Sequence, residues 1–127
     1  MSFDKFHHSL LDKLIDARVD IDAYLQLRKA KGYMTVSESD ALRNRLFSLC
    51  AELRQNAPQL KKNCTPQEFE ALRHAGESVA KAAVCLMSGH HDCPQYVTID
   101  THKLGSCLNI LTHSIQFLRT SAPFAQA

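Results

Sequence analysis

The feature that most constrains this chain is an apolar spacing of alternately three and four residues, which recurs in four separate segments. In the last segment the spacing runs unbroken through Val97, Thr101, Leu104, Leu108, Leu111, Ile115 and Leu118. Such spacing keeps apolar side chains on one stripe of an α-helix, whereas a half-buried strand shows a period of two. We therefore predict an all-α fold, in which the short stretch 96–99 is the only candidate strand.

Start and stop signals place the four helices at about 3–31, 38–57, 66–88 and 98–119, with a loose tail over 120–127. The third start is the clearest, because Thr65 can cap the helix and Glu68 can close a capping box. Gly32 is a natural stop for the first helix. The fourth can be capped by Thr98 or Asp100.

The second helix has a weaker start and a sharper expected end. Ser37 can cap it, with Asp40 at the third helical position. Its end is predicted before Pro58, because the residue that precedes a proline is biased away from the α region. Asn56 and Ala57 are then its last residues.

A length of 127 residues favours one domain, since two independent cores would each bury too little apolar surface. Four amphipathic helices joined by short loops then predict an antiparallel four-helix bundle. The long first helix and the extra apolar residues of the last leave more apolar surface than one bundle needs. A homodimer or a partner would cover that surface, and the alternative is that one chain buries it all.

Composition narrows the function classes. The chain is 45% hydrophobic and 22% charged, with a net charge of +2, which is too balanced to favour direct nucleic-acid binding. No run of 18 apolar residues predicts a membrane span, and the N-terminus does not resemble a secretory signal. An odd count of 5 scattered cysteines indicates reduced thiols in the cytoplasm. Neither a nucleophile elbow nor a phosphate-binding glycine loop occurs, so we predict no enzyme.

One alternative function is a metal- or redox-responsive helical sensor. Its candidate ligands lie between the third and fourth helices: Cys85, His90, His91 and Cys93. Thiolate and imidazole are the usual ligands of zinc, so zinc is the expected ion. The spacing lacks paired C-x2-C knuckles, and a solvated histidine-rich loop is the competing interpretation.

A second alternative is a histidine phosphotransfer-like module. The segment 102–106 (HKLGS) resembles in part the motif of the histidine phosphotransfer domains, which are small four-helix bundles with a phosphorylatable histidine. That motif places lysine three and glycine four residues after the histidine. Here Lys103 follows His102 by one residue and Gly105 follows by three, so the register differs.

The leading hypothesis is a small cytoplasmic bacterial regulatory or adaptor protein that binds another protein, such as an anti-activator that inhibits a transcriptional regulator. Expected anchors are the seam of the last helix and its flank: Leu104, Leu108, Ile110, Leu111, Ile115, Phe117 and Leu118. A repeat of carboxylates on the first helix, Asp12, Asp16 and Asp20, is the second candidate surface. A basic partner would suit it, and a solvated face is its other interpretation.

Overall fold

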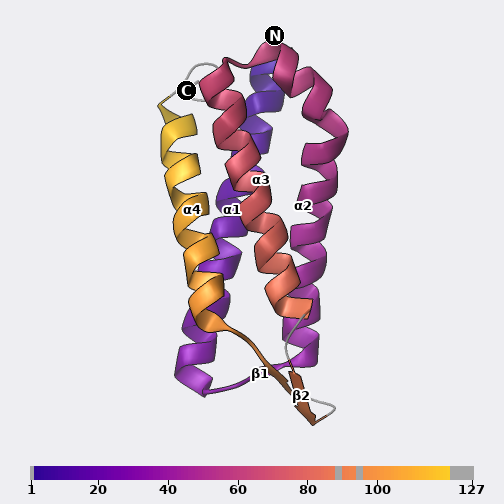
Figure 1. Cartoon of the computed structure of the whole chain (residues 1–127), viewed down its shortest axis with the longest axis vertical. Coiled ribbons are helices and arrows are strands. Elements are labelled where there is room, and N and C mark those ends of the chain that lie inside the picture. The colour runs from indigo at the N-terminus through magenta and orange to yellow at the C-terminus, as the bar shows by residue number, and fades with distance from the viewer. Residues whose placement is uncertain (1, 88–89, 94–95, 121–127) are drawn as a thin grey trace.

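The computed structural model of the chain covers residues 2–87, 90–93 and 96–120, with side chains described for 7–86 and 99–120. The helices are α1 (Ser2–Lys31), α2 (Val36–Asn63), α3 (Pro66–Met87) and α4 (Thr101–Arg119). They lie side by side along the long axis, and successive helices run in opposite directions (Figure 1). Helices make up most of the described chain, which confirms the all-α prediction in its general form.

A small sheet lies at one end of the molecule, and of its strands the sequence indicated the one within 96–99 alone. It consists of β1 (Met34–Thr35), β2 (His90–Cys93) and β3 (Tyr96–Thr98), in the order β1-β3-β2 with antiparallel neighbours. Strands this short contain too few residues to show a period of two. The sheet pairs the α1–α2 connection with the α3–α4 connection, because Met34 lies opposite Val97 and Thr35 opposite Tyr96 (Figure 1).

Two of the expected helix ends, the end of α1 and the start of α3, are confirmed, whereas α4 begins at Thr101 and not at 98, because Thr98 lies in β3. Gly32 has a φ of +84°, in the left-handed region that favours glycine. Thr65 and Glu68 form a reciprocal capping box, with N···O distances of 2.9 and 3.1 Å. At α4, the Asp100 carboxylate accepts from the Lys103 backbone N–H, so Asp100 is the cap.

Both predicted ends of α2 are wrong. Thr35 is its N-cap in place of Ser37, since Thr35 and Glu38 form a capping box with N···O distances of 3.1 and 2.9 Å. At the other end the helix continues through Pro58 as far as Asn63. Continuation places Leu60, 2% exposed, in the core, and this burial offsets part of the cost of a proline inside the helix.

The core lies between the four helices and is formed by the stripes that the apolar spacing indicated. The stripe of α1 includes His7, Leu10, Leu14, Ala17, Ile21 and Tyr24, all buried. The buried stripe of α3 consists partly of small residues. At Gly76 the two helices are so close that the Cβ of any other residue would lie 3.4 Å from Leu53 Cδ1 of α2. Small side chains therefore set the close approach of α3 to α2.

Candidate functional site

Most of the predicted anchors on α4 belong to the core of the chain itself. Four of them are no more than 3% exposed: Leu104, Leu111, Ile115 and Leu118. Leu108 is half-buried and packs against the same core. The unbroken seam of α4 is thus the side that faces α1 and α3, and these side chains are not on the surface that a partner would meet.

The other two anchors lie on the surface. Ile110 is 45% exposed and Phe117 is 42% exposed. They are seven residues apart, which is two helical turns, so both lie on one face of α4. This face is where the structure leaves large apolar side chains accessible on that helix.

A groove of about 470 Å³ runs beside this face, between the first half of α3 and the second half of α4. Its lining residues are Pro66, Gln67, Glu70, Ala71 and His74 from α3, and His113, Ser114 and Phe117 from α4. The groove therefore combines an aromatic side chain with two imidazoles and a carboxylate. Ile110 and these lining residues are called the α3–α4 surface below.

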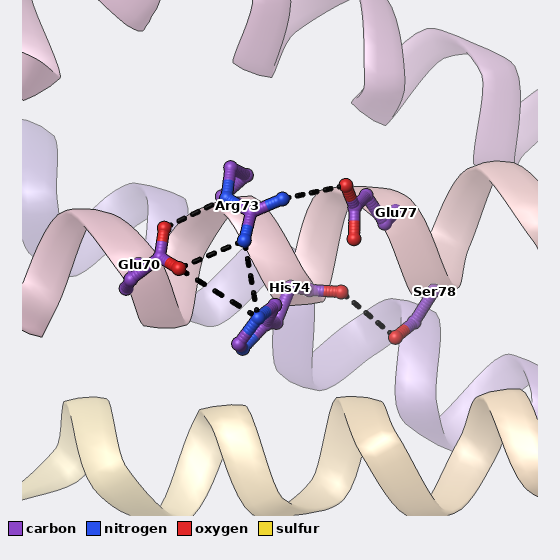
Figure 2. A network of polar contacts seen from close by, with 5 residues as sticks. All are labelled: Glu70, Arg73, His74, Glu77 and Ser78. Atoms are coloured by element: carbon purple, nitrogen blue, oxygen red, sulfur yellow. Dashed lines mark hydrogen bonds and ion pairs between the residues drawn. The ribbon is translucent and has the colours of Figure 1, made fainter.

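A network of hydrogen-bonded, charged side chains lies along the α3 edge of the groove (Figure 2). Arg73 donates two hydrogen bonds to Glu70, with N···O distances of 2.7 and 2.8 Å, and a third to Glu77 at 2.8 Å. The guanidinium lowers the pKa of Glu70, and the two carboxylates raise the pKa of Arg73. Both carboxylates are exposed and share one guanidinium, so acidic groups outnumber basic groups in this network by one.

His74 lies next to this network, on the side of α3 that faces α4 (Figure 2). Its Nε2 is 3.9 Å from Glu70 Oε2 and 3.4 Å from an Arg73 nitrogen. The backbone carbonyl of His74 accepts a hydrogen bond of 2.8 Å from the Ser78 hydroxyl. Glu70, His74 and His113 were not singled out as a binding site, and the available signal was the spacing of four residues that places Glu70 and His74 on one helix face.

The predicted acidic surface of α1 is partly used within the chain. Asp20 pairs with Arg45 of α2 at 3.1 Å, and Lys13 pairs with Glu52 at 2.7 Å. These two ion pairs connect α1 to α2 along one side of the molecule. Asp12 and Asp16 are exposed, so they are the part of the predicted stripe that the solvent reaches.

The structure gives little support to the two alternative sites, the cysteine–histidine metal site and the phosphotransfer histidine. The side chains of His90, His91 and Cys93 lie outside the described residues, whereas Cys85 is half-buried on α3. Among the side chains that are described, no group of three His, Cys, Asp or Glu residues is arranged to hold a metal ion. His102 is exposed in the first turn of α4.

One further contact involves a cysteine. Cys64 Sγ lies 3.7 Å from Nε2 of the buried His7, and burial together with Glu68 raises the pKa of this thiol to about 11. This contact does not follow from spacing along one helix, because it joins segments far apart in the sequence. Cys85 of α3 and Cys107 of α4 are free thiols, and burial raises the pKa of each.

Within the described ranges, no helix combines the length and the apolar character needed to cross a membrane.

Comparison with known proteins identifies the family. The chain is 52% identical to the biofilm regulator BssR of Escherichia coli strain K12 and equally to that of Shigella flexneri, over 127 residues and the whole of both proteins. No solved structure matches the chain. The model of the biofilm formation protein family YliH/bssR matches residues 1–126. With agreement over this length, the chain belongs to the YliH/bssR family of biofilm formation proteins.

Proposed function

We propose that this protein is a cytoplasmic regulator of biofilm formation that binds a transcriptional regulator and inhibits it. The regulatory part rests on the 52% identity, over the full length, to proteins named as biofilm regulators. Binding to a protein, as the mode of action, is supported by the large apolar side chains that remain exposed beside a groove on α4.

The observation that carries the binding proposal is the pair Ile110 and Phe117. Large apolar and aromatic side chains at the centre of an interface supply most of the binding free energy. The apolar seam of α4 is buried within the chain and is not accessible to a partner. We therefore propose the α3–α4 surface as the docking surface instead of the seam. The groove beside Phe117 gives a partner side chain a place to insert.

The proposed occupant is an amphipathic helix of the transcriptional regulator. Its apolar face would cover Ile110 and Phe117, in the manner of a helix that docks into a groove. We expect the polar side of the partner helix to be basic. Glu70 and Glu77 share the single guanidinium of Arg73, so a lysine or arginine of the partner would pair with these carboxylates.

The test compares two double variants in a strain that lacks the gene. One carries Ile110→Asp with Phe117→Asp, and the matched control carries Val19→Asp with Val84→Asp, two side chains of similar exposure on α1 and α3. Thermal melting by circular dichroism first establishes that both variants fold. Biofilm mass and transcription of the genes that change in the deletion strain are then measured.

We expect the α4 variant to lose complementation and the control variant to keep it. A photo-crosslinking residue at position 117 should then capture the regulator, and the purified pair should bind with the wild type and not with the α4 variant. Full complementation by a folded α4 variant would contradict the proposal. A wild-type homodimer that the α4 variant converts to a monomer would instead identify a second copy of the chain as the occupant.

A further inference from the structure

We propose that a second groove, between α2 and α3, binds a medium-chain carboxylic acid, with the acyl chain on the apolar floor of the groove and the carboxylate on Arg54. This α2–α3 groove shares no lining residue with the groove beside Phe117, so the proposal is independent of the partner-binding function argued above. It rests on the shape, the lining and the charge of the α2–α3 groove.

The α2–α3 groove is long and of a size that suits a small molecule. Its volume is about 280 Å³, near the lower end of the range for small-molecule sites, about 300–1,000 Å³. It lies along two neighbouring helices that run in opposite directions (Figure 1). Its lining extends from Cys50 to Leu60 on α2 and from Phe69 to Ala80 on α3. Because a helix rises about 1.5 Å per residue, the groove is about 15 Å long, which favours a linear chain as its occupant.

The floor of the groove is apolar. Leu53, Leu60 and Leu72 line it and are at most 9% exposed. Small residues of both helices leave the space above these leucines open, namely Ala57, Gly76 and Ala80. An alkyl chain in this space would exchange water for apolar surface, and each methylene buried should raise the affinity about threefold.

Charged side chains form the rim of the groove, and one of them has no partner of opposite charge. Arg73 is held by Glu70 and Glu77, whereas no ion pair among the described residues involves Arg54. Helical side chains lean toward the N-terminus of their helix, so the guanidinium of Arg54 lies toward the Cys50 end of the groove. The effect on that thiol agrees, since burial raises the pKa of Cys50 and the charge of Arg54 lowers it.

The unpaired arginine indicates the head group of the ligand. A guanidinium binds a carboxylate through two parallel N–H···O hydrogen bonds. With the carboxylate on Arg54, the acyl chain runs along the floor toward Leu60 and Phe69. Glu77 lies on the opposite rim, but its charge is paired with Arg73 at 2.8 Å. One carboxylate and one unbranched chain therefore match the free cation and the apolar floor.

The experiment titrates the purified full chain with sodium decanoate, below the concentration at which decanoate forms micelles, and follows the alanine methyl groups by NMR. The methyl signals of Ala57 and Ala80, which line the groove, should shift, whereas that of Ala30, exposed on α1, should not. Affinity should rise about threefold with each methylene from hexanoate to decanoate. Decyltrimethylammonium has the same chain and the opposite charge, and it should bind at least fivefold more weakly than decanoate.

Two variants test the two halves of the site, each with a matched control. Arg54→Gln should weaken decanoate binding by about fivefold, the upper end for an exposed ion pair, and Lys62→Gln, at an exposed cation of α2 outside the groove, should leave it unchanged. Ala80→Leu fills the groove and should abolish binding, whereas Ala30→Leu should not. Circular dichroism establishes that each variant folds.

Several results would overturn the proposal. They are unshifted Ala57 and Ala80 signals in excess decanoate, equal binding of decanoate and decyltrimethylammonium, and full affinity in the folded Arg54→Gln variant. A dimer of the chain whose interface covers Ala57 and Ala80 would also overturn it, because a second copy would then occupy the groove. None of these results bears on the complementation test of Ile110 and Phe117, so the two proposals can fail separately.

Discussion

Tyr24 and Ser39 form a buried hydrogen bond that connects α1 to the first turns of α2. The two hydroxyl oxygens are 2.7 Å apart, and both side chains are at most 5% exposed. A buried hydroxyl cannot bond to water, so it costs folding free energy when its protein partner is removed. Loss of either member of the pair should therefore lower stability. The pair thus links the two helices at the end that carries the sheet.

Ser39→Ala is expected to destabilise the protein by about 1–3 kcal/mol, because it leaves the Tyr24 hydroxyl buried and unpaired. Tyr24→Phe should have an effect of similar size. The double variant should lose less than the sum of the two, since it leaves no orphaned hydroxyl. Urea unfolding of the four proteins measures the coupling, and additive losses would contradict it.

The same pair gives a dependence on alkaline pH. Burial, the largest effect, raises the pKa of Tyr24 above its ordinary value of 10.0. The neutral phenol is therefore favoured in the folded state, so the stabilising contribution is complete below pH 10 and is lost as the pH rises through the folded pKa. Tyr24→Phe should remove this part of the alkaline loss of stability.

At the scale of the element, the start of α2 shows which of two nearby hydroxyl side chains, Thr35 and Ser37, caps the helix. Thr35 accepts from the Glu38 backbone N–H, and the Glu38 carboxylate accepts from the Thr35 backbone N–H and from Lys31. Ser37, the predicted cap, lies inside the helix and is exposed. Both residues are chemically suited to capping, so residue type alone did not distinguish them.

Thr35→Ala should destabilise the protein by about 1 kcal/mol, the usual loss for a helix cap. Ser37→Ala is the matched control and should change stability little, because alanine is a better helix former than serine. Chemical denaturation measures both. Equal losses in the two variants would contradict the assignment of Thr35 as the cap.

Acid should weaken the same helix start. Hydrogen bonds from the Thr35 backbone and then from Lys31 lower the pKa of Glu38 below 4.5. The carboxylate therefore contributes stability above pH 4.5, and this contribution is lost as the pH falls through the folded pKa. Glu38→Gln should make the stability curve flatter in this range, by a modest amount because the side chain is partly exposed.

At the scale of the whole molecule, Met34 connects the small sheet to the core of the helices. Met34 is 1% exposed although it lies in a connection between helices, and its strand pairs with β3. A side chain buried there connects the helix core to the sheet. The sheet end of the molecule should therefore depend on this one residue.

Met34→Ala is expected to destabilise the protein by about 2–5 kcal/mol, through lost apolar burial and the cavity that remains. Leu27→Ala, at a side chain that is 42% exposed, is the control and should change stability by about 0.5 kcal/mol or less. Thermal unfolding distinguishes the two. Equal melting temperatures for the two variants would show that the sheet end contributes little to global stability.

The positions of the helices could be predicted from the sequence, whereas the residues that tertiary packing buries could not. Periodicity and capping chemistry are local, and they located α1, α3 and α4 within a few residues. Pro58 was misjudged because the burial of Leu60 is a tertiary effect. Likewise, the apolar spacing places Leu111 on the stripe of α4 and Ile110 beside it, but only the packing of the other helices shows that this chain itself covers the stripe and leaves Ile110 exposed.

The position of the sheet also has a consequence for the order in which the chain folds. Contacts between successive helices close short loops, whereas all of α2 and α3 separates β1 from β3 in the sequence, and the α1–α4 contact joins residues as far apart as Arg18 and Thr112. The entropy lost on closing a loop grows with its length, so contacts distant in sequence form late. We expect the contacts between successive helices to form first, and the β1–β3 pairing and the α1–α4 contact to form later.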